Sequence, residues 1–196
     1  MASQTTPHPS ATDRARDRAE LAAALPHILA ALADVGTLDM IVVRPEHGLR
    51  RDVAHTRLTA SHGVEGDHWS RGCWRTTEDG RPHPDVQICL MMSRMIGAIA
   101  GERARWAAAG DNLFIDMNLT PANLPPGSRI AIGSCILEIT AEPHNGCQSF
   151  IDRYGRDACV FVNTGDGKTH RLRGIYARVV QDGTVTAGDA VRKLAG

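Results

Sequence analysis

The sequence lacks an excess of charge of either sign, a long hydrophobic run and an apolar leader. Lys+Arg and Asp+Glu both number 22, so the net charge is zero and the basic surface typical of a nucleic-acid-binding protein is absent. No apolar run approaches the roughly 18 residues that a membrane-spanning helix needs. Residues 1–10 are polar and contain two prolines, so we expect them to be disordered and not to act as a secretory signal. We therefore expect no nucleic-acid partner and no membrane partner.

Paired cysteines and several catalytic motifs are also lacking. The five cysteines are odd in number and form no Cys-x-x-Cys pair, which argues against a disulfide framework and favours a location in the cytoplasm. The glycine loops that bind phosphate or dinucleotides, the Gly-x-Ser-x-Gly elbow and the His-Glu-x-x-His helix are absent. Nine histidines, six of them between His47 and His144, keep metal binding open without indicating one site.

The chain divides into a helical segment and one mainly β domain. Leucine and isoleucine recur at helical spacing within residues 11–36, which predicts a helix with capping residues at 10–13 and an end at Gly36. Pro26 lies inside this pattern and predicts a break or kink near Leu25. Residues 38–196 hold short apolar segments separated by turn signals. This pattern is typical of a β-barrel with a few short helices, so the predicted fold class is mainly β (α+β).

Individual elements follow from the same patterns. A turn is predicted over 163–168, a bulge at Gly174, and a hairpin at Asp182-Gly183 that sets Val180 opposite Val185. Residues 60–84 form a long loop whose two tryptophans favour packing over disorder. The apolar segments predict strands over 40–43, 52–59, 86–91, 112–119, 129–132, 135–140 and 170–181, and helices over 93–100 and 102–109.

One hairpin can be predicted in register. Gly133-Ser134 suits a two-residue turn, and pairing across it sets Ile132 opposite Cys135 and Ile130 opposite Leu137 on one face. The other face then pairs Arg129 with Glu138, an opposite-charge match worth about 0.2–1 kcal/mol. Because the hydrophobic register and the charge match agree, Cys135 is predicted to lie in the core.

Cys147 lies in the segment that is best suited to chemistry. The predicted strand that begins at Cys135 stops abruptly at Glu142-Pro-His-Asn-Gly-Cys-Gln148. This arrangement displays a thiol at a strand end, three residues after His144, and loops held by a rigid sheet commonly carry reactive groups. A cysteine that packs as a small hydrophobic residue is the alternative, and the sequence pattern leaves both open.

The order of three further motifs resembles the MOSC family, the domain of molybdenum cofactor sulfurase C-termini. They are Gly63-Val-Glu-Gly-Asp-His68, Gly110-Asp-Asn112 and Pro143-His-Asn-Gly-Cys147, and the tail from Leu172 to Asp189 supports them. The resemblance covers about residues 40–192. It implies a MOSC-type β-barrel and a single reactive cysteine, here Cys147. The chain has Arg81-Pro-His-Pro-Asp85 where many reductase members of the family carry a His-Gly-Gly segment.

The resemblance also implies a function. In the family the thiol is thought to carry sulfur or to ligate molybdenum in a bound pterin cofactor, and relatives reduce N-hydroxylated compounds. Pyridoxal phosphate binding is a further association of the family. By this hypothesis the partner is a small-molecule substrate or a sulfur donor protein. Cys147 and His144 would be catalytic, and the molybdenum cofactor (molybdopterin) would be bound by Asp67, Asn112, Arg153 and Arg173.

Two other hypotheses remain open at this point. In one, Cys147, His144 and His68 or His62 bind zinc, since three N/S ligands and a water would form a hydrolase or lyase site. In the other, the chain is a non-catalytic small-molecule binding domain in which Cys147 only packs. The sequence makes no prediction of oligomeric state.

Overall fold

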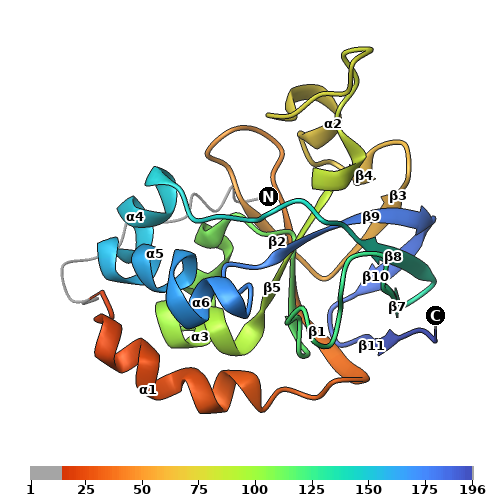
Figure 1. Ribbon diagram of the computed structural model, residues 1–196. Helices are drawn as coiled ribbons and strands as arrows, with labels where there is room; N and C mark the ends of the chain where they lie inside the picture. Colours follow the sequence, from red (N-terminus) through yellow and green to blue (C-terminus); the bar gives the residue numbers. More distant parts are fainter. Residues whose placement is uncertain (1–14, 196) are drawn as a thin grey trace.

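The computed structural model describes residues 15–195. Seven of its strands close into a barrel (Figure 1). The ring closes because β1 pairs with β6 on one side and with β11 on the other, and β2 adds to the edge of β1. The strands, in order around the barrel, are β1 (Val35–Val43), β11 (Ala190–Lys193), β7 (Arg129–Ile132), β8 (Cys135–Ile139), β9 (Ile175–Gln181), β5 (Ile88–Met92) and β6 (Leu113–Asp116), with β2 at Arg51–Val53.

A smaller sheet lies beside the barrel. It joins β10 (Gly183–Thr186), β3 (His55–Thr59) and β4 (Gly63–Val64). The predicted hairpin of Val180 with Val185 is therefore wrong, since Val185 pairs with Thr56 of β3. The chain crosses from one sheet to the other at Gly183, where a Cβ would lie 2.4 Å from the Cys135 backbone nitrogen. An alternating pattern shows that a strand exists but not which strand it pairs with.

Helices gather on one side of the barrel, where α1, α3, α4, α5 and α6 lie together (Figure 1). Their bounds are α1 Arg18–Leu29, α2 Trp69–Gly72, α3 Ser93–Ala100, α4 Gln148–Tyr154, α5 Arg156–Asn163 and α6 Gly165–Thr169, with 3₁₀ helices η1 at Pro84–Val86 and η2 at Arg103–Ala109. None of the helices within residues 15–195 is long and apolar enough to cross a membrane.

The N-terminal helix differs from its prediction. It spans Arg18–Leu29 instead of residues 11–36, because Asp17 and Glu20 form a capping box and β1 already begins at Val35. Pro26 lies inside the helix without ending it. The predicted capping residues 10–13 lie outside the described residues.

Three further elements were predicted in part. The segment 52–59 is split at Ala54 into β2 and β3, which belong to different sheets. The predicted turn over 163–168 is largely the short helix α6, and the strand predicted over 170–181 begins only at Ile175. In the long loop, Trp69 is buried as expected, whereas Trp74 is 69% exposed.

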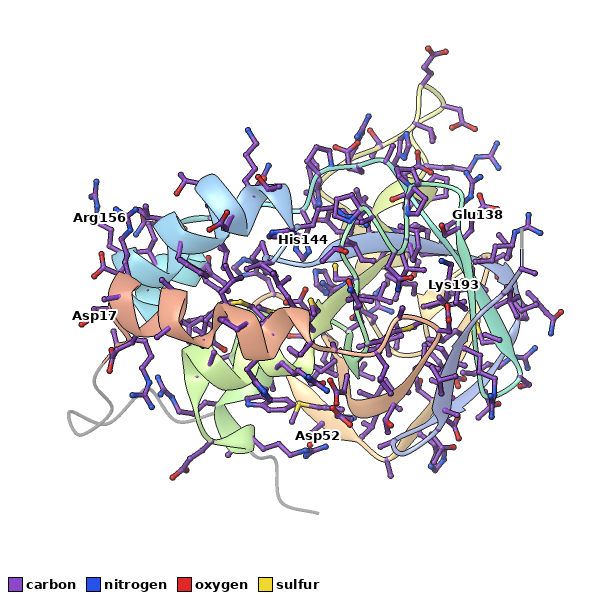
Figure 2. All side chains as sticks on the ribbon, turned by 60° about the horizontal axis from the view of Figure 1, so that its bottom comes forward. Asp17, Asp52, Glu138, His144, Arg156 and Lys193 are labelled. Atoms are coloured by element: carbon purple, nitrogen blue, oxygen red, sulfur yellow. The ribbon has the colours of Figure 1, made fainter. Side chains whose placement is uncertain are left out.

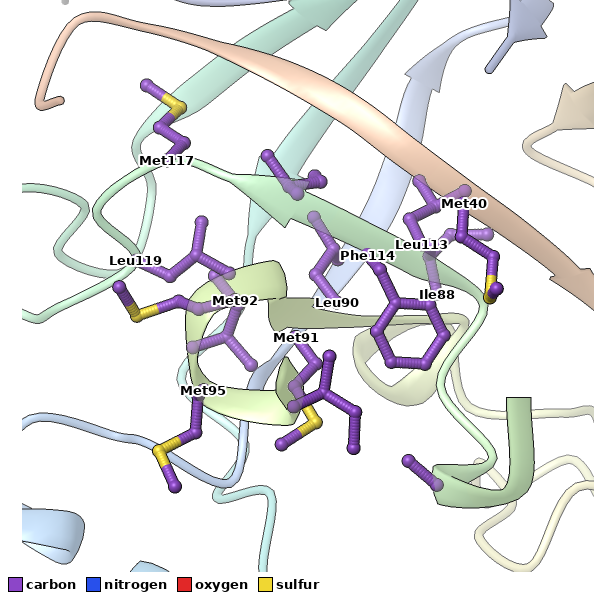
Figure 3. Packing of buried hydrophobic residues seen from close by; sticks show 14 of the residues in the cluster. Met40, Ile88, Leu90, Met91, Met92, Met95, Leu113, Phe114, Met117 and Leu119 are labelled. Carbon is purple, nitrogen blue, oxygen red and sulfur yellow. The ribbon is translucent and has the colours of Figure 1, made fainter. Parts of the chain in front are cut away.

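The core fills the barrel and the space between the barrel and α3. All five residues of β5 are buried, which is expected of a strand with both faces covered. Figure 3 shows Met91, Met92 and Met95 of this region close to Phe114 and Leu119. Because β5 and β6 are parallel, α3 and η2 form the crossover between them. This crossover brings the end of η2, at Gly110 to Asn112, beside Cys89.

The predicted hairpin is confirmed in every pair. Arg129 faces Glu138, Ile130 faces Leu137 and Ile132 faces Cys135. Arg129 donates a 3.0 Å hydrogen bond from Nε to Glu138 Oε2, and Cys135 is fully buried.

Candidate functional site

The segment between β8 and α4 runs across one end of the barrel and carries Cys147 to the surface (Figure 1). Cys147 is the N-cap residue of α4, is exposed, and forms no disulfide. Phe150 and Tyr154 on the inner side of the same helix are buried, so the helix is anchored while the thiol stays open to solvent. The exposed thiol agrees with a reactive role and not with a packing role for Cys147.

Asn163 of α5 fixes the turn before the thiol. Its Oδ1 accepts a 2.8 Å hydrogen bond from the Gly146 backbone nitrogen, and its Nδ2 donates a 3.0 Å hydrogen bond to the Gly146 carbonyl. Two hydrogen bonds from one planar amide restrain both the position and the orientation of the peptide. The position of Cys147 therefore depends on α5 as well as on α4.

Arg173 and Asp111 form a buried ion pair beneath this turn. Arg173 Nη1 lies 3.0 Å from Asp111 Oδ1 and 2.8 Å from Oδ2, and Nη2 donates to the Ala109 carbonyl at 3.2 Å. The guanidinium also stacks over the Phe150 ring, 4.8 Å from its centroid. Arg173 thus connects η2 to α4, and one of its nitrogens, Nε, is buried without a hydrogen-bond partner in residues 15–195.

His144 lies against this pair and is labelled in Figure 2. Its Nδ1 is 3.5 Å from Asp111 Oδ1, and its ring packs on Tyr176 with the centroids 4.4 Å apart. Nδ1 is buried and has no hydrogen-bond partner among the described residues. Burial, with the charges of Arg173 and Arg44, lowers the pKa of His144 well below its ordinary value of 6.5. The imidazole is therefore neutral at pH 7, and its Nδ1 faces the Asp111 carboxylate.

Gly174 allows this close packing. Its φ of +122° lies in a region that favours glycine, and a Cβ there would lie 2.4 Å from the Leu90 carbonyl and 3.1 Å from His144 Nδ1. The predicted bulge at Gly174 is wrong, because Gly174 precedes β9, which begins at Ile175. At Gly174 the backbone packs closely against Leu90 of β5.

Asp67 and Asn112, two of the predicted cofactor-binding residues, hold Arg44. Asp67 accepts hydrogen bonds from Arg44 Nε at 2.9 Å and Nη2 at 3.1 Å, and Asn112 Nδ2 donates to it at 3.0 Å. Burial alone would raise the pKa of Asp67, but the hydrogen bonds and charge of Arg44 outweigh this effect and lower it. Both residues are at most 2% exposed, so they position Arg44 instead of facing solvent.

Arg44 directs its remaining donor toward the turn at the end of η2. Its Nη1 donates a 3.0 Å hydrogen bond to the Gly110 carbonyl and lies 3.5 Å from Cys89 Sγ. Asn112 completes the connection, because its Oδ1 accepts from the Cys89 backbone nitrogen at 3.1 Å. Gly110-Asp111-Asn112 is therefore held by Arg44 on one side and by Arg173 on the other.

Two further arginines border Gly110 without a carboxylate partner. A Cβ on Gly110 would lie 3.4 Å from Arg50 Nη2 and 3.8 Å from Arg153 Nη1. Arg50 donates to the Leu49 carbonyl and Arg153 to the Ala108 carbonyl, and within residues 15–195 neither forms an ion pair.

The electrostatics of this pair favour an anion. Burial, followed by the positive charges of Arg153 and Arg44, lowers the pKa of Arg50 to about 10. Arg50 Nε is buried and has no hydrogen-bond partner in the part of the chain that the structure describes. A ligand with a phosphate or carboxylate group would relieve the repulsion and supply the missing acceptor.

The zinc hypothesis is not supported by the geometry. Among the described residues, no three His, Cys, Asp or Glu side chains are close enough to hold a metal ion. His68 Nδ1 is 2.8 Å from the Arg44 carbonyl, and His62 Nδ1 is 2.8 Å from Ser61 Oγ on an exposed turn. The predicted set of Cys147, His144 and one of these two histidines is thus not assembled.

Sequence reasoning missed Arg44, Arg50 and Asp111. Asp111 stood inside the Gly110-Asp-Asn112 motif, which was a usable signal. Arg44 and Arg50 border the predicted strand 40–43 and the turn after it, and no local pattern separates them from surface arginines. The structure brings these missed residues together with Arg153, Arg173 and His144, all around Gly110.

Solved structures of low sequence identity share the fold. The YuaD protein of Bacillus subtilis has a TM-score of 0.59 at 19% identity, with 80% of this chain and 94% of that chain covered. YiiM from Escherichia coli has a TM-score of 0.52 at 20% identity, with 82% and 70% covered. No curated protein matches the chain.

A family model identifies the chain directly. The model described as the MOSC domain matches residues 79–192, more than half of the sequence. That range contains the Gly110-Asp111-Asn112 turn, the segment that displays Cys147, and Arg173. This match, the closed barrel and the exposed thiol agree with one another, and the chain belongs to the MOSC domain family.

Proposed function

We propose that the chain binds a phosphate-bearing pterin cofactor of the molybdopterin type, with Cys147 as the thiolate ligand of its molybdenum. The observation that carries the proposal is the pair of neighbouring guanidinium groups, Arg50 and Arg153, neither of which forms an ion pair with a carboxylate within the described part of the chain. A site for a neutral ligand would not require two adjacent uncompensated cations.

The residues present suit such a group. Arg50 and Arg153 can each donate two hydrogen bonds to phosphate oxygens, and Arg50 has an unused buried Nε. Cys147 offers a soft thiolate, a ligand type suited to a soft metal. A bound molybdenum centre would supply two-electron redox chemistry, which the reduction of N-hydroxylated compounds requires.

The other residues of the site would orient the ligand. Neutral His144 packs between Asp111 and Tyr176 without adding charge to the site. Arg173 and Arg44 hold the turn at Gly110 between the phosphate-binding arginines and the Cys147 turn. Asp67 contributes indirectly because it holds Arg44, and Asn112 because it donates a hydrogen bond to Asp67.

The test is the molybdenum and pterin content of the protein produced in cells that make the cofactor. We expect Cys147→Ser to lose most of the metal, and Arg50→Gln with Arg153→Gln to lose both metal and pterin. Cys73→Ser and Arg57→Gln are matched controls, since Cys73 is half-buried in the long loop and Arg57 is an exposed arginine of β3. Retention of metal and pterin in all variants would refute the proposal.

Sulfur transfer is a second candidate, favoured by a specific observation. Cys147 is exposed at the tip of a turn, where a donor protein can reach it. In this function Cys147 would accept a sulfur atom as a persulfide. Mass spectrometry of the intact protein after incubation with a persulfide donor would test it. An unmodified Cys147 would exclude this candidate but leave cofactor binding intact.

A further inference from the structure

A second thiol, Cys159, lies beneath the Cys147 turn. Cys159 belongs to α5, is 6% exposed, and its Sγ is 4.0 Å from the Cys147 carbonyl oxygen. Neither cysteine forms a disulfide. The two residues are twelve positions apart but are brought together by the turn between α4 and α5.

The contact is maintained by Asn163 and Gly146. Asn163 Nδ2 donates to the Gly146 carbonyl at 3.0 Å and lies 3.4 Å from Cys159 Sγ, so one amide touches both the turn and the thiol. A Cβ on Gly146 would lie only 3.0 Å from Cys159 Sγ. The absence of a side chain at position 146 therefore lets the sulfur pack directly against the peptide that precedes Cys147.

The environment gives the two thiols an order of reaction. Cys147 is exposed and meets reagents first. Cys159 is 6% exposed, so a reagent in solution does not reach its thiol directly. A disulfide or persulfide formed at Cys147 would lie in the residue that Cys159 Sγ already contacts. Cys159 can therefore attack only after Cys147 has reacted.

We infer that Cys159 is the resolving thiol of Cys147, acting on a disulfide or persulfide formed at that residue. Cys159 Sγ loses its proton to solvent and attacks Cys147 Sγ. The bond between Cys147 Sγ and the outer sulfur breaks, and the outer sulfur leaves with the electron pair, as hydrosulfide or as a thiolate. The product is a Cys147–Cys159 disulfide, which an external dithiol reduces to restore both thiols. In its persulfide form this step rests on the sulfur-transfer candidate, whereas the mixed-disulfide form does not.

The test uses an aromatic disulfide reagent, dithiobis-nitrobenzoate, on the Cys73→Ser protein, so that the half-buried Cys73 does not contribute. We expect about two equivalents of coloured thiolate to be released per chain, with the second release independent of protein concentration. Intact mass would show the loss of two hydrogens and no retained adduct. Peptide mapping should find Cys147 linked to Cys159.

Two variants complete the design. Cys159→Ser should release about one equivalent and retain a stable adduct on Cys147, and Cys147→Ser should leave Cys159 nearly unreactive because it is buried. A stable adduct on Cys147 in the protein that retains Cys159, or a disulfide to Cys89, would overturn the inference. The measurement on the protein that retains Cys159 does not depend on the folding of any Cys159 variant. It needs neither molybdenum nor a persulfide donor, so its failure is distinguishable from failure of the proposed functions.

Discussion

The four arginines around Gly110 fall into two pairs with opposite environments. Arg44 and Arg173 each face a buried carboxylate, at 2.9 Å and 2.8 Å respectively. Within residues 15–195, Arg50 and Arg153 donate only to backbone carbonyls. The first pair builds the site, because a buried ion pair fixes the geometry of the elements it joins. The second pair is left with unused charge, which is the property of a binding surface. Substitutions should separate these two roles.

The largest decrease in the free energy of unfolding is expected from Arg173→Leu. It leaves Asp111, which is fully buried, without its counter-charge. Breaking a buried pair on one side costs roughly 3–5 kcal/mol, so the free energy of unfolding in urea should fall by about that amount. Arg153→Leu is the matched control, since it removes an arginine that has no carboxylate partner. Equal losses for the two variants would contradict the division into pairs.

A smaller decrease in the free energy of unfolding is expected from Arg44→Met. Asp67 would keep its hydrogen bonds from Asn112 Nδ2 and the Trp69 backbone nitrogen, so only part of its stabilisation disappears. Loss of hydrogen bonds to a charged group costs roughly 2–3 kcal/mol here. Urea unfolding should place this variant between Arg173→Leu and the native protein. A loss larger than that of Arg173→Leu would reverse the expected order.

The buried imidazole predicts a pH dependence. Because the pKa of His144 is lowered in the folded state, the unfolded chain binds an extra proton below its own pKa of about 6.5. The contribution of neutral His144 to the free energy of unfolding is therefore fully present above about pH 6.5. Below that pH it decreases by at most roughly 1.4 kcal/mol per pH unit. His144→Gln should flatten the unfolding free energy between about pH 6.5 and pH 5, whereas the exposed His62→Gln should not. An unchanged slope in His144→Gln would show that another group carries it.

The smallest change in stability is expected from Arg50→Gln. Its removal relieves repulsion with Arg153, so unfolding free energy should change by less than about 0.5 kcal/mol. Binding of inorganic phosphate or a phosphorylated pterin, measured by calorimetry, should weaken by about tenfold or more, which corresponds to about 1.4 kcal/mol. If phosphate affinity is unchanged, the second pair of arginines is not a binding surface.

Local features of this protein were predictable, and long-range ones were not. The 129–138 hairpin was predicted pair by pair, because its turn, apolar alternation and charge match all lie within ten residues. The abrupt strand end allowed an exposed or a packed Cys147, and the structure has the exposed one. In contrast, Arg44 lies 23 positions from Asp67, and Arg173 lies 62 from Asp111.

Those contacts depend on how the sheet closes, which no local period encodes. The same limit explains the incorrect partner of β10. The alternating pattern predicts which side chains of β10 face the core. It does not predict that β10 pairs with β3 instead of β9, because that pairing depends on how the two sheets pack.

The pairing of β1 with β11 has a consequence for biosynthesis. The two edges that meet there are separated by nearly the whole barrel sequence, so the ring stays open on the ribosome until residues 190–193 emerge. Open strand edges invite association with other nascent chains, and contacts of such wide separation form slowly. A cofactor or sulfur atom that arrived before translation had passed β11 would therefore meet a barrel that is still open between β1 and β7.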